Sequence, residues 1–91
     1  MPSVDDLGQP ISYLLLEPGA SVIASDGKEV GRVKEVRADT EKDIFDSVVV
    51  EQGMLGGERR VVPGDQVDQI FERGVVLKLD AAAYGSLPED A

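Results

Sequence analysis

The sequence predicts a small all-β domain whose short strands curl into a barrel. Short apolar runs are separated by turns that contain glycine, one run is rich in β-branched residues, and helical periodicity is almost absent. A length of 91 residues with 42% hydrophobic residues allows one modest core. We therefore expect five or six strands in a single domain, with a short helical turn near the C-terminus.

The chain is expected to begin with a flexible acidic arm over residues 1–10, because this stretch is polar and contains chain breakers. Residues 11–17 are densely apolar and must be buried, although a strand and a short helix both fit their pattern. The domain itself is expected to span residues 11–88, with residues 89–91 as a tail.

A tight hairpin is predicted around residues 25–28, which read Ser-Asp-Gly-Lys. Asp26 is suited to a hydrogen bond from its side chain to the backbone, and Gly27 supplies the positive φ that a short reversal needs. Strands are therefore expected on both sides of this turn.

The strand after the hairpin changes its pattern partway along. Gly31 has no side chain, and the apolar residues Val33 and Val36 fall on opposite parity. Because successive side chains of a strand alternate between faces, we expect either a β-bulge near residues 34–35 or an exchange of faces. A glycine and a bulge together bend a sheet, so a bulky residue in place of Gly31 is expected to unfold the domain.

The middle of the chain holds the clearest strand, over residues 44–51, which are rich in β-branched residues. Its expected core face is Ile44, Val48 and Val50, while Phe45 and Val49 indicate that both faces are partly covered. Residues 37–43 before it have the composition of a solvated loop. The remaining expected elements are a strand over residues 58–62, a turn and strand over 65–71, a turn at Arg73 and Gly74, a strand over 75–80, and a helical turn over 81–84 with Asp80 as its N-cap.

The residue types that the chain lacks limit the catalytic and metal sites it can form. The chain contains no cysteine and no histidine, which excludes Ser-His and Cys-His catalytic pairs as well as thiolate and imidazole metal ligands. We therefore expect a protein that is not an enzyme and needs no cofactor. The lack of cysteine also fits a reducing compartment, and we expect a cytoplasmic location.

The charge balance narrows the set of partners. Eighteen acidic residues against nine basic residues give a formal charge of −9, which should repel nucleic acids and anionic membranes. No apolar run is long enough to span a membrane. Arg32, Lys34 and Arg37 form a local basic group, but exposed strand positions explain them without RNA binding.

An acidic cluster formed by Asp39, Glu41, Asp43 and Asp46 is the candidate metal site. Calcium and magnesium need several oxygen ligands, but the spacing departs from that of a calcium-binding loop and includes Lys42. A solvated acidic loop is the better interpretation, and binding of a small molecule or divalent cation there remains the alternative function.

A surplus of apolar residues is more informative, because we expect it to exceed what a core this small encloses. The interface candidates are Leu14, Leu16, Met54, Leu55 and Phe71. A patch formed by such residues would bind a protein partner or a second copy of the chain, giving a homo-oligomer. Full burial of these residues in a barrel is the competing interpretation.

Four motifs in order resemble the PRC-barrel domains, a family that includes the barrel of photosynthetic reaction centre H subunits and that of the ribosome maturation factor RimM. The motifs begin at Gly19, Ile44, Val62 and Gly74, and read GASVIASDGKEVGRVKEV, IFDSVVV, VPGDQV and GVVL. The resemblance covers residues 11–88 and is closest to small stand-alone bacterial members.

The resemblance implies a six-stranded β-barrel with a short terminal helix that serves as a docking and assembly module. It carries over no catalytic residue. We therefore expect an adaptor that binds through an apolar patch or an exposed strand edge, with Asp26, Gly27, Gly31 and Gly74 as structural turn or bend residues.

Overall fold

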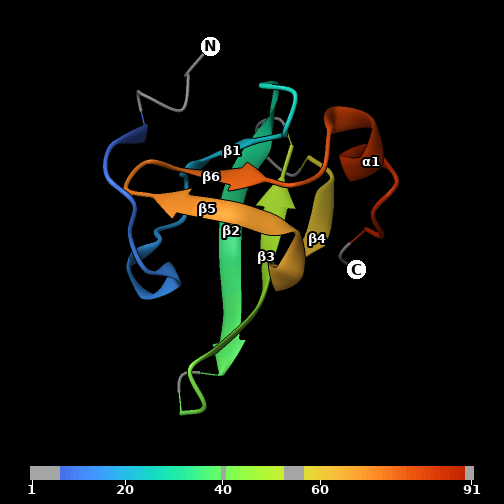
Figure 1. The fold of residues 1–91 in the computed structure, drawn as a ribbon. Coiled ribbons are helices and arrows are strands. Elements are labelled where there is room, and N and C mark those ends of the chain that lie inside the picture. Colours follow the sequence, from blue (N-terminus) through green and yellow to red (C-terminus); the bar gives the residue numbers. More distant parts are fainter. Residues whose placement is uncertain (1–6, 40, 53–56, 90–91) are drawn as a thin grey trace.

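The computed structural model of the chain describes residues 7–39, 41–52 and 57–89. Its main feature is a single six-stranded sheet, followed by one short α-helix (Figure 1). The elements are η2 (Tyr13–Leu15), β1 (Ser21–Ile23), β2 (Glu29–Asp39), β3 (Ile44–Glu51), β4 (Arg59–Pro63), η3 (Gly64–Gln66), β5 (Val67–Phe71), β6 (Gly74–Leu77) and α1 (Ala81–Gly85). The predicted all-β fold and its C-terminal helical turn are confirmed, and Asp80 caps that turn. No helix among the described residues is long and apolar enough to cross a membrane.

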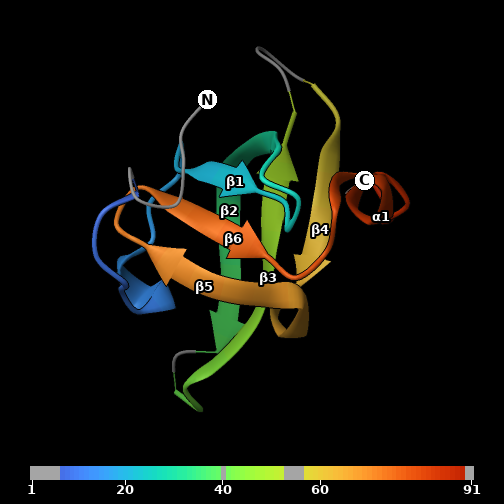
Figure 2. The same ribbon diagram turned by 45° about the horizontal axis from the view of Figure 1, so that its top comes forward.

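The sheet curls over itself but does not close into a complete barrel. The strand order is β4-β3-β2-β1-β6-β5, with β1 and β6 parallel and the other neighbouring pairs antiparallel. In Figures 1 and 2, β5 and β6 run across β2 and β3, so one half of the sheet faces the other. The outer strands β4 and β5 are not hydrogen-bonded to each other, and the expectation of a closed barrel is therefore wrong.

Both outer strands are instead covered by the segments at the two ends of the described chain. At β5, the amide of Ile11 donates to the carbonyl of Ile70 at 2.9 Å. At β4, the amide of Val61 donates to the carbonyl of Pro88 at 3.4 Å, and Pro63 has no amide proton to offer. The terminal segments thus occupy the edges that a closed barrel would have removed.

Residues 7–10 belong to the folded domain, so the predicted flexible arm does not include them. Leu7 is only 1% exposed, and its carbonyl accepts a hydrogen bond from the amide of Arg73 at 2.9 Å. Gly74 is the first residue of β6, and a Cβ there would lie 2.6 Å from a methyl carbon of Leu7. Glycine is therefore needed at position 74 because Leu7 packs so close to it, whereas the turn itself is formed by Glu72 and Arg73. The rest of the predicted arm lies outside the described residues.

The predicted hairpin connects β1 and β2, which pair in antiparallel fashion. Gly27 has a φ of 87°, and its amide donates to the carbonyl of Ala24 at 2.9 Å. Asp26 lies in the turn, but its carboxylate makes no hydrogen bond within the described part of the chain, contrary to the expectation. The reversal therefore depends on the backbone and on Gly27.

The predicted bulge is confirmed in β2. The register against β3 shifts between Val33 and Glu35, which leaves Lys34 as the extra residue. Because the bulge changes the alternation of side chains, Val33 and Val36 both pack on the core despite their opposite parity in the sequence.

The pairing of β2 with β3 contains a second bulge, in β3, which the sequence analysis does not predict. The register shifts again opposite Arg37 and Ala38, and here Asp46 is the extra residue. Phe45 consequently packs against the core while Ile44 is 51% exposed, so the expected inward position of Ile44 is wrong. The pairing also extends β2 to Asp39, where a loop from residue 37 was predicted.

The core lies between the two halves of the curled sheet. One buried cluster joins them, and its members are Leu16, Val22, Ala24, Val30, Val33, Val48, Val50, Val62, Ile70, Val75, Leu77 and Tyr84. Most of these residues are valines, which suit the tightly curved strands because β-branched side chains pack well on a pleated surface.

Candidate functional site

Two leucines of η2 are the most exposed large hydrophobic residues in the described part of the chain. Leu14 is 58% exposed and Leu15 is 66% exposed, whereas the next residue, Leu16, is 8% exposed and belongs to the core. The short 3₁₀ turn therefore separates an apolar run of three into two outward residues and one inward residue.

This turn is held in place on both sides. The Tyr13 ring stacks on the Phe45 ring with centroids 5.3 Å apart, and the Tyr13 hydroxyl donates to Asp43 at 2.8 Å. On the other side Leu16 is packed into the core, and the Ser12 hydroxyl accepts from the Leu14 amide at 3.2 Å. The exposed leucines are thus presented on an anchored turn, which lowers the entropy cost of binding a partner.

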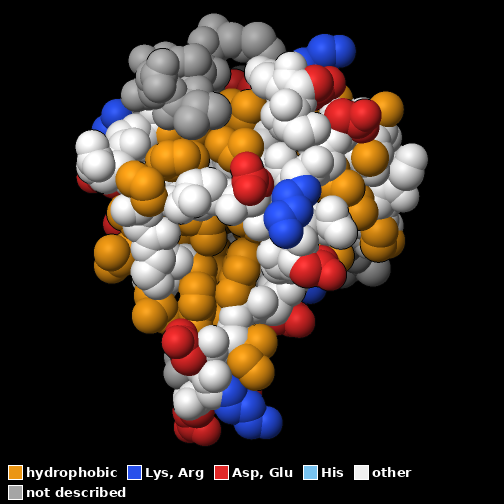
Figure 3. Space-filling view, viewed as in Figure 1, with side chains coloured by type: hydrophobic (Ala, Val, Ile, Leu, Met, Phe, Trp, Pro, Cys, Tyr) orange, Lys and Arg blue, Asp and Glu red, His pale blue; other side chains and the backbone are white. Residues whose placement is uncertain are grey.

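A hollow of about 210 Å³ lies beside this turn, lined by Ile11, Phe45, Gly64, Val67, Asp68, Gln69 and Ile70. Phe45 links it to η2 through the stacking with Tyr13. In Figure 3, hydrophobic side chains gather at the lower left, between η2 and the long hairpin of β2 and β3. We name this surface the η2 face and define it as Ile11, Tyr13, Leu14, Leu15, Phe45 and Val67.

The described residues among the predicted interface candidates differ in exposure. Leu14 is exposed, as an interface residue must be, but Leu16 is buried and its place in an interface is wrong. Phe71 is half-buried at the end of β5, where it forms an isolated bridge with Pro10. Met54 and Leu55 lie outside the described residues.

The acidic cluster does not form a metal centre in the described part of the chain, where no group of three or more acidic side chains is placed to hold an ion. Asp39 accepts from the backbone amide of Lys42 at 3.3 Å, and Asp43 accepts from the hydroxyl of Tyr13. Glu41 is exposed in the turn and Asp46 is the bulged residue of β3. We therefore draw no cation site from these four residues.

The Asp43 contact also bears on the chemistry of Tyr13. The hydrogen bond to Asp43, partial desolvation and the negative charges of Asp43 and Asp39 together raise the pKa of Tyr13. Asp43 itself has a left-handed backbone with a φ of 53°, a conformation that aspartate tolerates better than most residues. The η2 face therefore has a negative electrostatic environment at its junction with the β2–β3 hairpin.

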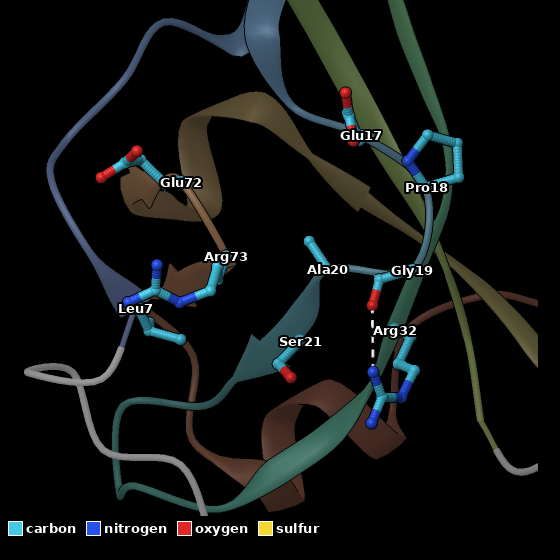
Figure 4. A pocket seen from close by; sticks show the side chains of 9 residues that line it. All are labelled: Leu7, Glu17, Pro18, Gly19, Ala20, Ser21, Arg32, Glu72 and Arg73. Atoms are coloured by element: carbon cyan, nitrogen blue, oxygen red, sulfur yellow. Dashed lines mark hydrogen bonds between the residues drawn. The ribbon is translucent and has the colours of Figure 1, made fainter.

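A second, larger hollow of about 420 Å³ lies on another side of the molecule (Figure 4). Its charged lining residues are Glu17, Arg32, Glu72 and Arg73. Arg32 donates to the carbonyl of Gly19 at 3.1 Å, and Glu72 accepts from the amide of Gln9 at 2.8 Å. Because acidic and basic groups balance and take part in internal contacts, this hollow favours no particular class of ligand.

Several residues of the η2 face were not predicted. Leu15 lies within the apolar run that was noted, but the sequence does not show which side of a short turn faces outward. Tyr13 and Phe45 come together from positions far apart in the chain. An aromatic residue beside an acidic loop was the only available signal for this contact.

The comparisons with known proteins agree with this architecture. A family model for the PRC-barrel domain matches residues 19–83, which is more than half of the chain. Comparison with curated proteins gives no match. The matched segment begins after η2, so the family pattern carries no information about Leu14 and Leu15. Because the match takes in every strand from β1 to β6, together with the start of α1, the chain belongs to the PRC-barrel domain family.

Proposed function

We propose that this PRC-barrel domain is an adaptor that binds another protein through the η2 face, with self-association as a second mode of assembly. The observation that carries the proposal is the exposure of Leu14 and Leu15 on an anchored turn. Burying one leucine side chain is worth roughly 1.5–3 kcal/mol, so covering both would add substantially to an interface.

The hollow beside η2 supports the same proposal. Its apolar lining comes from Ile11, Phe45, Val67 and Ile70, and its polar lining includes Asp68 and Gln69. Protein interfaces are commonly organised around an apolar centre that accepts a side chain of the partner. The anchored turn projects two leucines, and the neighbouring, partly apolar hollow could receive a side chain of the partner.

Binding through a strand edge has less support. The outward carbonyl of Ile70 on β5 and the outward amide of Val61 on β4 already form hydrogen bonds with the segments that cover these strands. Strand addition needs free backbone groups on the outer strand, and Pro63 removes one donor from β4. We therefore place the adaptor function on the η2 face.

The proposal assigns no catalytic step to the protein. The sequence has neither histidine nor cysteine, the side chains most often used as bases and nucleophiles near neutral pH. The same lack of cysteine supports a cytoplasmic location as part of the proposal.

A charge-insertion experiment tests the proposal. The double variant Leu14→Asp/Leu15→Asp should remain folded, because both side chains are exposed, but should lose co-purifying proteins from the native cell. Sedimentation velocity over a range of concentrations would show in parallel whether the wild type self-associates and whether the variant does not.

Ile44→Asp is the matched control, since Ile44 is 51% exposed but lies outside the η2 face. This variant should keep the wild-type partners and the wild-type sedimentation behaviour. If the leucine double variant retains both as well, the η2 face is not the binding surface and the proposal fails.

A further inference from the structure

The η2 face is bordered by carboxylates. Asp68 lines the hollow, and Asp43 holds the hydroxyl of Tyr13 at 2.8 Å. Asp39 is near enough for its charge to contribute to the raised pKa of Tyr13. In Figure 3, acidic atoms lie along the border of the hydrophobic area at the lower left. An apolar surface with a negative rim is the result.

These carboxylates have no arginine or lysine partner in the described part of the chain, which they share with Asp26, Asp65 and most other described acidic residues. The ion pairs among the described residues join Arg32 to Glu29, Arg37 to Glu35, Arg59 to Glu51 and Arg60 to Glu58. None of the ion pairs within the described ranges includes Asp39, Asp43 or Asp68. Between residues 39 and 46, four acidic residues are accompanied by one lysine. The negative charge beside the η2 face is therefore largely uncompensated within the domain.

This charge distribution argues against a second copy as the main occupant. A symmetric dimer places the same patch of both copies face to face, so the two acidic rims would oppose each other. The formal charge of −9 on each chain adds repulsion at longer range. A partner with positive charges gains from the same rim that a second copy must overcome.

We infer that the η2 face binds a segment of another protein in which apolar side chains are flanked by lysine or arginine. The apolar side chains cover Leu14 and Leu15 and enter the hollow, while the cations meet Asp43 and Asp68. This inference rests on the proposed adaptor function and adds the chemical class of the partner.

Synthetic peptides provide the test on the intact chain. One peptide carries leucines flanked by arginines, a second carries glutamates in place of the arginines, and a third keeps the arginines but replaces each leucine with glycine. Calorimetry should detect binding of the first peptide, with at least about tenfold weaker binding of the other two. Raising the salt concentration from about 50 mM to about 300 mM should lower the affinity for the first peptide several-fold, because the Debye length shortens and the charges are screened.

The double variant Asp43→Asn/Asp68→Asn identifies the responsible charges. This variant should bind the first peptide several-fold more weakly, and its affinity should depend less on salt. The asparagine at position 43 can still accept the hydrogen bond from the Tyr13 hydroxyl, so the turn should stay anchored. The control Glu58→Gln/Glu89→Gln removes the same charge near β4 and should leave binding unchanged.

The possible failures of this inference and of the adaptor function can be told apart. The inference of a basic partner fails if the glutamate peptide binds as tightly as the arginine peptide, or if the double aspartate variant keeps the wild-type salt dependence. Neither result contradicts the adaptor function. Self-association that is lost in Leu14→Asp/Leu15→Asp and strengthened by salt also overturns the inference of a basic partner, in favour of a second copy. Absence of binding to all three peptides, together with native partners that do not depend on the two leucines, overturns both.

Discussion

Gly31 carries no side chain because the end of β3 passes directly over its α-carbon. A Cβ there would lie 2.7 Å from the carbonyl oxygen of Glu51 and 2.8 Å from a methyl carbon of Val50. The first of these atoms belongs to the backbone of a paired strand, so it cannot move aside without breaking the pairing. The need for glycine here comes from close packing and not from a positive φ.

Gly31→Val is therefore expected to leave the domain largely unfolded at room temperature. Displacing β3 would cost several kcal/mol, which is comparable to the roughly 5–15 kcal/mol that stabilises a typical domain. Circular dichroism and urea unfolding are the measurements. Gly85→Ala is the control, because nothing lies within 4 Å of its Cβ position and alanine favours a helix by up to about 1 kcal/mol. A Gly31→Val protein as stable as the wild type would contradict the close approach.

Tyr84 is a buried residue whose hydroxyl has no hydrogen-bond partner among the described residues. It is 2% exposed, and neither its hydroxyl nor the Nε of Arg60 has a hydrogen-bond partner among the described residues. Burial raises the pKa of Tyr84; the charge of Arg60 acts in the opposite direction and that of Glu58 in the same direction. The hydroxyl thus gives up its hydration without an internal hydrogen bond in return.

Tyr84→Phe should leave stability unchanged or raise it by up to about 1 kcal/mol, whereas Tyr84→Ala should lose roughly 3–5 kcal/mol through the cavity. The ring therefore contributes packing, and the hydroxyl contributes little. Urea unfolding of the two variants measures this difference. A loss well beyond 1 kcal/mol in Tyr84→Phe would show that the hydroxyl has a stabilising partner.

The same variant has a predicted pH dependence. Because the folded-state pKa is raised above the ordinary value of 10.0, the preference for the neutral phenol contributes fully below that pH. It is lost as the pH rises through the folded-state pKa. Between about pH 8 and about pH 11, the free energy of unfolding should fall less in Tyr84→Phe than in the wild type. Some decrease should remain in the variant, because the pKa of Tyr13 is raised as well.

At the scale of elements, bulges decide which strand residues reach the core. Lys34 in β2 and Asp46 in β3 are each an extra residue in the pairing of these two strands. The first brings Val36 to the core, and the second exchanges Ile44 for Phe45. Without the second exchange, the ring on which Tyr13 stacks would point away from η2.

The segment of residues 7–11 acts as an additional edge strand in all but length. Leu7 and Gln9 accept hydrogen bonds from the amides of Arg73 and Glu72, and Ile11 donates to Ile70. Leu7 fills the space that Gly74 leaves open at the start of β6. This segment covers β5 and leads directly into η2, so its attachment also positions the η2 face.

Leu7→Ala should consequently destabilise the domain by about 2–5 kcal/mol, the usual cost of truncating a buried leucine. Leu14→Ala is the matched control, and because Leu14 is 58% exposed it should change stability by less than about 0.5 kcal/mol. Chemical unfolding followed by circular dichroism compares the two. Equal effects would show that residues 7–10 are not packed on the domain in solution.

At the scale of the whole molecule, the open sheet is completed by the two ends of the described chain. The N-terminal segment lies on β5 and the C-terminal segment on β4, where Arg60 forms an isolated bridge with Glu89 and donates to the carbonyl of Leu87 at 2.6 Å. Edge pairing between molecules is thereby limited. The η2 face therefore exposes apolar side chains, not free strand edges, on a strongly acidic molecule.

The distribution of charge determines which partners the molecule should attract or repel. Arginines neutralise four carboxylates in and beside β2, β3 and β4, whereas most other acidic residues in the described parts of the chain, those beside the η2 face included, have no ion-pair partner. A molecule with this excess of negative charge should repel copies of itself and attract cationic partners at low salt.

The local features of the fold could be predicted from the amino-acid sequence. Glycine and aspartate marked the hairpin, β-branched runs marked the strands, the parity of Val33 and Val36 located the bulge near Lys34, and four motifs identified the family. These predictions succeed because turn chemistry and strand propensity depend on neighbouring residues in the chain.

Which apolar residues stay exposed, in contrast, depends on how the chain packs. Leu14 and Leu15 point outward and Leu16 inward because Tyr13 is held by Phe45 and Asp43, at least 30 positions further along the chain. The bulge at Asp46 and the docking of Leu7 against Gly74 likewise depend on distant strands. Exposure is a property of the packed molecule, and a pattern of apolar residues does not record which side of a short turn will be covered.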